Sequence, residues 1–169
     1  MSQMFLIRMA EAIDDGLITV TAKDGSVVQS SQIWDDVYSR LTFVMENFRD
    51  EETGLLNHGY SVASKEVNNG FWSRGMGWYT MVLMEAAAKM PDAAKKETLT
   101  NYYGELMSSI MEWQDPETFL WYNVTDGREE LGCYNKDGKW IENKPEASGS
   151  AMFAYCLLRG YHDGLLKGE

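Results

Sequence analysis

The sequence predicts an all-α fold built from helical hairpins, and two observations carry this prediction. Apolar residues recur at helical spacing in five stretches of the 169-residue chain. The pattern Asp-x-Glu-Thr-x-Leu occurs at residues 50–55 and again at 115–120, each time directly after an amphipathic helix. Units repeated in this way stack, because each hairpin buries its apolar face against the next. We therefore expect a helical toroid or solenoid, with a compact five-helix bundle as the alternative.

The first predicted helix begins at residue 1 and ends near Asp15-Gly16. Its apolar face contains Met1, Met4, Phe5, Met9, Ala12 and Ile13. The following residues 19–28, around Lys23-Asp24-Gly25, form either a short hairpin or a loop. The helix starts with an apolar residue that is already on its buried face. The chain also holds two and a half repeat units, where at least three are usually needed. We therefore expect residues 1–169 to form one partial domain that lacks its N-terminal half.

The second predicted helix is capped by Ser30 or Ser31. Its apolar face contains Ile33, Trp34, Val37, Tyr38, Leu41, Val44, Met45 and Phe48. Asp35 and Asp36 are the visible carboxylate pair, and sugar hydrolysis generally uses two carboxylates. Adjacent helical residues point about 100° apart, however, and acidic residues in a first turn complement the helix dipole. We therefore favour a structural role for this pair and retain Asp36 only as a candidate general acid.

Three further helices complete the predicted array. The third runs from about Ser73 to Met90, where Pro91 stops it. The fourth ends before Asp115 and carries Leu99, Tyr102, Tyr103, Leu106, Ile110 and Trp113 on its apolar face. The fifth starts after Ser148-Gly149, and residues 151–158 are apolar on nearly all sides, which predicts burial all round.

Composition excludes several function classes. Lys and Arg number 15 against 26 Asp and Glu, a formal charge of −11, so a nucleic-acid partner is not expected. Apolar runs stay short of the roughly 20 residues of a membrane span, so no membrane partner is expected either. Cys133 and Cys156, like His58 and His162, are too far apart for a metal clip, and we expect no metal or other cofactor. Two free thiols are typical of a reducing compartment, which predicts a cytoplasmic protein.

Residues 69–79 are the densest candidate for ligand binding. Two Trp, one Tyr and one Arg lie within eight residues, interleaved with Gly. Arg74 can hold a carboxylate through two parallel hydrogen bonds, Trp78 can stack on the apolar face of a sugar, and their spacing of four places both on one helix face. The alternative is that the Trp residues pack the core and that Arg74 is a surface ion-pair partner.

Three polar segments are further candidates. His58 lies in the loop 56–60 after the first Asp-x-Glu-Thr turn, and residues 121–126, beginning with Trp121, occupy the corresponding place in the second unit. Residues 146–151 enter the fifth helix, where backbone N–H groups can face a ligand. A structural hydrogen bond by His58 and helix capping by Ser148 are the alternatives at these positions.

Four motifs taken together resemble a known family of enzymes. They are Asp-x-Glu-Thr-Gly-Leu-Leu-x-His-Gly-Tyr (50–60), Phe-Trp-Ser-Arg-Gly-Met-Gly-Trp-Tyr (71–79), Gln-Asp-Pro-Glu-Thr-x-Leu-Trp-Tyr (114–122) and Glu-Ala-Ser-Gly-Ser-Ala-Met-Phe-Ala-Tyr (146–155). In this order they are similar to the unsaturated glucuronyl and rhamnogalacturonyl hydrolases, glycoside hydrolase families 88 and 105. The resemblance implies an (α/α)6 toroid, of which about five helices would be present here as a C-terminal half.

The resemblance also implies a reaction. The substrate is an oligosaccharide, left by a polysaccharide lyase, whose non-reducing end is a 4,5-unsaturated uronic acid. An Asp protonates the enol-ether double bond, water adds at the neighbouring carbon, and the resulting hemiketal opens and releases the remaining sugar. No metal or organic cofactor takes part in this hydration.

Site residues follow from the resemblance position by position. The substrate-binding candidates are His58, Trp72, Arg74, Trp78, Tyr79, Trp121, Ser148 and Ser150. Met76 and Tyr60 depart from the family pattern. The general-acid Asp of the family would fall upstream of Met1, so we expect the isolated chain to be inactive. A non-catalytic helical module that binds sugars or a partner is the alternative function. Half a toroid would leave helix edges exposed, which predicts self-association that covers them.

Overall fold

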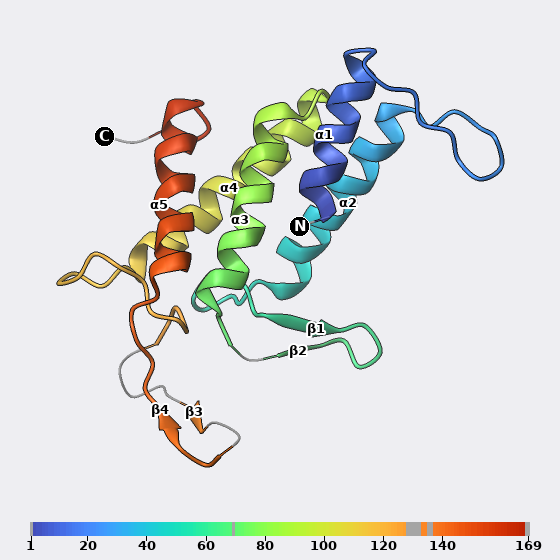
Figure 1. Ribbon diagram of the computed structural model, residues 1–169. Helices are drawn as coiled ribbons and strands as arrows, with labels where there is room; N and C mark the ends of the chain where they lie inside the picture. Colours follow the sequence, from blue (N-terminus) through green and yellow to red (C-terminus); the bar gives the residue numbers. More distant parts are fainter. Residues whose placement is uncertain (1, 69, 128–132, 135–136, 168–169) are drawn as a thin grey trace.

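The computed structural model describes residues 2–68, 70–127, 133–134 and 137–167, and the described chain is mostly helical (Figure 1). Two short antiparallel hairpins, β1–β2 and β3–β4, accompany the helices. In chain order the elements are α1 (Ser2–Asp14), α2 (Ser30–Phe48), β1 (Gly59–Ser61), β2 (Glu66–Asn68), α3 (Ser73–Lys89), α4 (Ala93–Glu112), β3 (Cys133–Tyr134), β4 (Trp140–Ile141) and α5 (Ala147–His162). The all-α prediction is confirmed, and each predicted helix is present.

The helices lie in two layers (Figure 1). One layer holds α1, α3 and α5 side by side and parallel, and the other holds α2 and α4 behind them. Both hairpins and the turns that follow α2 and α4 lie at the end where α3 and α5 begin. This arrangement gathers the long connections, and with them the candidate motifs, at one end of the array.

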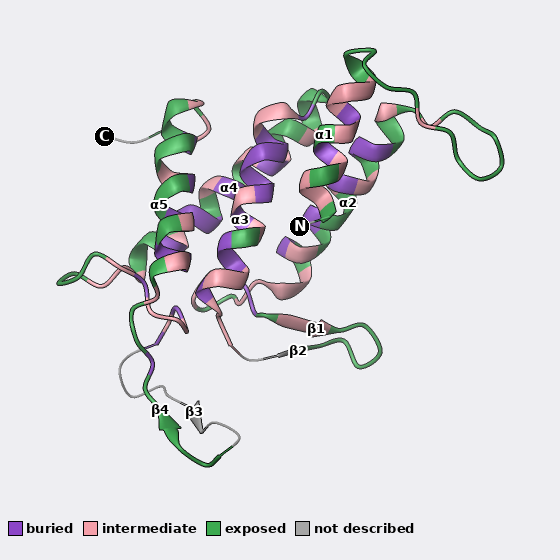
Figure 2. Ribbon diagram, viewed as in Figure 1, coloured by how far each residue is buried: buried purple, intermediate pink, exposed green. Residues whose placement is uncertain are grey.

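The core lies where the two layers face each other (Figure 2). The buried face of α2 agrees with the predicted stripe, including Trp34, Val37 and Leu41. The N-cap differs: it is Gln29, whose backbone N–H donates to Oε1 of Gln32 at 2.9 Å, and neither Ser30 nor Ser31. Because α2 starts at Ser30, Asp35 and Asp36 belong to its second turn and not to the first. Residues 19–28 form a loop with one isolated bridge, Thr21 to Val27.

Two predicted apolar faces are wrong in part. Phe5 of α1 is 68% exposed, because Ile7 and Ala10 face α2 and α3, and two residues on a helix turn the side chain by about 200°. Met1 lies outside the described residues. The predicted burial of α5 on every side is also wrong: Phe153 and Cys156 are buried, whereas Tyr155, Leu158 and Tyr161 are exposed. The reason is position, since α5 lies at the end of its layer while α3 lies between two neighbours (Figure 2).

The internal repeat is confirmed, and its two turns make the same hydrogen bonds. Asp50 Oδ1 accepts hydrogen bonds from the backbone N–H of Thr53 at 2.8 Å and from its hydroxyl at 2.9 Å. Asp115 Oδ1 accepts the same two bonds from Thr118, at 2.7 and 2.8 Å. These bonds hold the pKa of both carboxyls below the usual value. The two turns are therefore one structural unit used twice, in which Asp caps the turn.

The two turns differ at one position, which gives a testable pair of substitutions. Gly54 and Phe119 occupy equivalent places with φ of 69° and 58°, a region that disfavours bulky side chains. Phe119 is exposed, so Phe119→Gly removes backbone strain without opening a cavity. We expect an increase in the free energy of unfolding of about 1 kcal/mol, or about 2–4 °C in the melting temperature.

Gly54→Ala is the matched opposite change. A Cβ at Gly54 would lie 2.2 Å from Oγ and 2.9 Å from Cβ of Ser109, so this variant is expected to lower the melting temperature. Thermal unfolding followed by circular dichroism measures both variants. Equal shifts of the same sign in the two variants would contradict the equivalence of the turns.

No helix within the described ranges is both long and apolar enough to cross a membrane.

Candidate ligand-binding site

The candidate segments of the sequence meet at the N-terminal ends of α3 and α5. The backbone N–H of His58 donates to the carbonyl of Gly70 at 2.9 Å, which joins residues 56–60 to residues 69–79. A β-bridge pairs Trp72 with Val124 and so adds residues 121–126. The backbone N–H of Glu146 completes the assembly by donating to the carbonyl of Trp121 at 2.8 Å. Segments far apart in sequence therefore form one continuous surface.

Arg74 and His58 both contact the Trp72 ring on this surface. The guanidinium carbon of Arg74 lies 4.9 Å from the centre of the Trp72 ring. The His58 ring meets the same indole edge-on, with centroids 4.8 Å apart and planes at 86°. Gly75 makes room for them, because a Cβ there would lie 2.8 Å from the indole and 3.2 Å from Nδ1 of His58. Part of the glycine content of this motif is thus explained by side-chain packing.

Glu146 contacts Arg74 from α5. Its Oε1 lies 3.2 Å from Nη1 of Arg74, and the hydroxyl of Ser148 donates to both carboxylate oxygens at 2.7 and 2.9 Å. Glu146 is also the N-cap of α5, because it accepts the backbone N–H of Gly149. Burial alone would raise the pKa of Glu146, but the bonds from Gly149 and Ser148 and the charge of Arg74 outweigh it and lower the pKa.

Arg74 and two helix N-termini favour an anion at the site although the whole chain is acidic, whereas the Glu146 carboxylate beside them opposes one. The first turns of α3 and α5 converge here, and each helix N-terminus carries a partial positive charge. Hydrogen bonds between the described residues and Arg74 use Nη1, and 43% of the whole side chain is exposed, so the Nε–Nη2 edge is available to a ligand. The net charge of −11 is screened within about 8–10 Å in physiological salt. This edge can therefore hold a single carboxylate by two parallel hydrogen bonds.

Two of the predicted binding residues are part of the core. Trp121 is 2% exposed, and its indole N–H donates to the carbonyl of Ile110 at 2.7 Å. Ser150 is buried, and its hydroxyl accepts the backbone N–H of Trp121 at 2.9 Å. Both side chains are buried next to the site in this structure and offer little surface to a ligand. That they contact substrate stays a prediction.

The adjacent residues Trp78 and Tyr79 have different environments. Trp78 is exposed one turn beyond Arg74 on α3, so its indole face is open for stacking. The hydroxyl of Tyr79 donates to the carbonyl of Leu41 at 2.8 Å and ties α3 to α2. Burial raises the pKa of Tyr79 well above its usual value. Tyr79 therefore links α3 to α2 in this structure, and its predicted contact with a ligand stays a prediction.

Asp36 does not reach the site. It lies on the exposed surface of α2, where it pairs with Arg40 at 2.8 Å, while its neighbour Asp35 pairs with Lys95 from α4. Since α2 runs toward the site end, its second turn, which holds Asp36, lies away from the site in this structure, and its role as an acid stays a prediction that the geometry does not favour. Within the described ranges, His, Cys, Asp and Glu side chains form no group of three that could hold a metal ion.

One site residue was missed by sequence reasoning. Glu146 enters the sequence analysis only as the start of a motif, and Glu is not among the residues preferred as a helix N-cap. Its pairing with Arg74 joins residues 72 positions apart and has no local signal. The thiol of Cys156 is buried as expected, whereas the side chain of Cys133 lies outside the described residues.

Known proteins resemble this chain in sequence. A family model described as Glycosyl Hydrolase Family 88 matches residues 9–169. Protein Atu3128 of Agrobacterium fabrum and a 24.9 kDa protein in the picA locus of Rhizobium radiobacter are each 32% identical over 124 residues, or 69% of this chain and 48% of the relative. The chain therefore spans about half the length of the curated relatives that it matches.

Solved structures resemble it in fold. A family 105 glycoside hydrolase of C. acetobutylicum superposes with a TM-score of 0.67 at 28% identity, over 80% of this chain and 38% of that one. A family 88 glycosyl hydrolase from Bacteroides vulgatus gives 0.66 at 21% identity, over 98% of this chain and 42% of that one. The expected toroid architecture is confirmed at the level of the fold.

Proposed function

Because the chain belongs to glycoside hydrolase family 88 and shares its fold with family 105, we propose that it binds oligosaccharides that end in a 4,5-unsaturated uronic acid. The reaction of such a site is hydration of the enol-ether double bond, which releases the remaining sugar. One observation carries the proposal most directly: the Arg74 guanidinium is held over Trp72 with one edge open to solvent.

The other groups at the site fit this ligand. The first turns of α3 and α5 favour the uronate charge, and the hydroxyl of Ser148 lies 3.4 Å from Nη1 of Arg74, on the side of the guanidinium that Glu146 occupies. The Trp72 ring is already contacted by Arg74 and by His58. A sugar ring therefore stacks more readily on the exposed indole of Trp78. The exposed ring of His58 is available for a hydrogen bond to a sugar hydroxyl.

Protonation of the double bond requires a general acid, and Glu146 is poorly suited to that role. Its pKa is lowered, and it is hydrogen bonded to Ser148 and Gly149 and paired with Arg74. We therefore propose that the 169-residue chain binds the unsaturated sugar but hydrates it slowly or not at all. The same observation favours the second candidate function, a non-catalytic sugar-binding module.

Two measurements on one sample test these proposals. Titration calorimetry with an unsaturated uronyl disaccharide is expected to show binding at millimolar ligand, and the same disaccharide without the carboxylate is expected to show none. Ultraviolet absorbance of the conjugated double bond is expected to stay constant during incubation with the chain. Absence of heat in calorimetry rejects the binding proposal. Loss of absorbance rejects the proposed inactivity and shows that a general acid lies within these residues.

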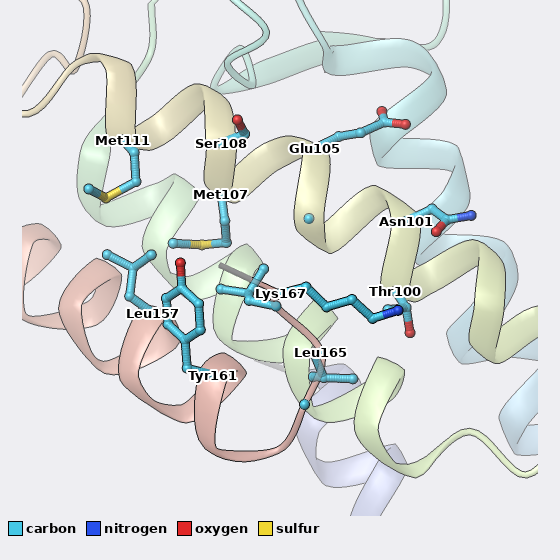
Figure 3. A pocket seen from close by; sticks show the side chains of 13 residues that line it. Thr100, Asn101, Glu105, Met107, Ser108, Met111, Leu157, Tyr161, Leu165 and Lys167 are labelled. Carbon is cyan, nitrogen blue, oxygen red and sulfur yellow. The ribbon is translucent and has the colours of Figure 1, made fainter. Parts of the chain in front are cut away.

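We also propose that the chain self-associates through the two ends of its first helical layer. At one end Tyr155, Leu158 and Tyr161 form an exposed stripe on α5, and at the other Phe5 is exposed on α1. The α5 stripe continues into a cavity of about 670 Å³ between α4 and residues 157–167, lined in part by Met107, Met111 and Leu157 (Figure 3). In a dimer with a twofold axis, the α5 end of each copy would contact the α1 end of the other copy. Both exposed apolar surfaces would then be covered.

Leu158→Glu tests this contact, because Leu158 is 74% exposed and its replacement costs the monomer little. Multi-angle light scattering is expected to give a dimer for the wild-type chain and a monomer for the variant. Lys65→Glu is the control, because it also makes the chain more acidic but lies in the exposed turn between β1 and β2, away from both ends of the layer. It should leave the dimer intact. A wild-type chain that is monomeric throughout contradicts the proposal.

A further inference from the structure

We propose that Glu146 is a positioning residue that orients the Arg74 guanidinium toward the carboxylate of the ligand. The inference rests on the proposed function, because it assumes that Arg74 binds the uronate. It assigns to Glu146 a role beyond capping α5, through an ion pair that joins the start of α3 to the start of α5.

The carboxylate of Glu146 is itself held in place from several directions. It accepts hydrogen bonds from the Ser148 hydroxyl and from the Gly149 backbone, and only 18% of its side chain is exposed. Gly149 packs closely enough that a Cβ there would lie 2.7 Å from the Ser73 hydroxyl oxygen and 3.0 Å from Oε2 of Glu146. A carboxylate so fixed can determine the position of a longer and more flexible partner.

Arg74 is that partner, and Glu146 touches only one part of it. Nη1 contacts Glu146 at 3.2 Å, while the guanidinium carbon lies 4.9 Å from the centre of the Trp72 ring. These two contacts restrict the position of the group. Among the described residues neither involves Nε or Nη2, so that edge is available for two parallel hydrogen bonds to a carboxylate. Because the side chain is ordered before the ligand arrives, less conformational entropy is lost on binding.

Two other roles for Glu146 predict different results. If it only caps α5, then any good capping residue should serve as well, and Asp is among the best. If it competes with the ligand for Arg74, then its removal should tighten binding. A positioning role predicts that both replacement by Asp and removal of the carboxylate weaken ligand binding. Asp keeps the charge and the cap, but it is too short to reach Nη1 from the same backbone position.

The first experiment examines Arg74 without any ligand. Nitrogen-detected NMR of the guanidinium groups, with the Arg74 signals assigned from Arg74→Lys, is expected to show hindered rotation of the Nη groups in the wild-type chain. Glu146→Asp should restore free rotation while leaving the melting temperature nearly unchanged. Asp92→Ala, which removes the cap of α4 and does not touch Arg74, should lower the melting temperature and leave the Arg74 signals as they are. Hindered rotation that persists in Glu146→Asp, or is missing in the wild-type chain, overturns the proposal.

The second experiment measures affinity for the unsaturated uronyl disaccharide by calorimetry. Both Glu146→Asp and Glu146→Gln are expected to weaken binding about tenfold, the effect of one charge-assisted hydrogen bond. Unchanged or tighter binding in these variants overturns the positioning role. If the wild-type chain itself fails to bind, the proposed function fails, while the ligand-free NMR result still decides whether Glu146 orders Arg74.

Discussion

Arg74→Ala is expected to weaken binding of the unsaturated uronyl disaccharide about 100-fold or more. The guanidinium offers two parallel charge-assisted hydrogen bonds to a carboxylate, and each such bond contributes about 1.5–3 kcal/mol. Arg74→Lys should also lose affinity, because an ammonium group cannot reproduce the planar fork or lie over the Trp72 ring in the same way. The fold should survive, since Glu146 keeps its bonds from Ser148 and Gly149. Calorimetry gives the affinity, and circular dichroism verifies the fold.

Arg40→Ala is the matched control for this substitution. Arg40 is exposed on α2, pairs with Asp36 and lies away from the site, so its removal changes the net charge by the same amount without touching a ligand contact. We expect its affinity for the disaccharide to stay within about twofold of the wild-type value. Equal losses in the two variants would attribute the effect to the overall field of the chain. No loss in either would place the carboxylate elsewhere.

Sequence periodicity was sufficient to predict the helices and insufficient to predict what covers them. The apolar stripe of α2 was predicted correctly because the helix has one clear apolar face. The mostly apolar α5 gave no such contrast, so its exposed residues Tyr155 and Leu158 were expected inside. Which side of a uniformly apolar helix is buried depends on where it lies in the layer, and that is a property of the tertiary structure.

The candidate site was predictable as a set of segments and less so as a set of contacts. Arg74, Trp72 and His58 come together as the motifs suggested, because backbone bonds join the loops that carry them. Tyr79 lies next to Trp78 in sequence, yet it faces α2 and binds a backbone carbonyl. The sequence does not predict the Arg74–Glu146 ion pair. Arg74 can be explained locally as a surface cation and Glu146 as a residue at a helix start, so neither points to the other.

Trp121→Ala is expected to lower the free energy of unfolding by about 3–5 kcal/mol. The indole is nearly inaccessible, lies 5.3 Å from the ring of Phe153 at a T-shaped angle, and donates its N–H to Ile110. The substitution therefore creates a cavity between α4 and α5 and removes one of the two hydrogen bonds that the Ile110 carbonyl accepts, the other coming from the backbone N–H of Trp113. Since domains are stable by about 5–15 kcal/mol, this loss is a large fraction of the total. Urea unfolding followed by circular dichroism measures it.

Trp78→Ala separates the structural role of a tryptophan from a ligand-binding role. Trp78 is 41% exposed on α3 against 2% for Trp121, so its loss should cost clearly less than that of Trp121, about 1–2 kcal/mol, and Ala favours a helix. Its effect should instead appear in calorimetry, as weaker binding of the disaccharide through lost stacking. Trp121→Phe keeps most of the buried ring and should recover much of the stability lost in Trp121→Ala. If Trp121→Ala and Trp78→Ala destabilise the chain equally, the assignment of Trp121 to the core is wrong, and its role as a ligand contact has to be reconsidered.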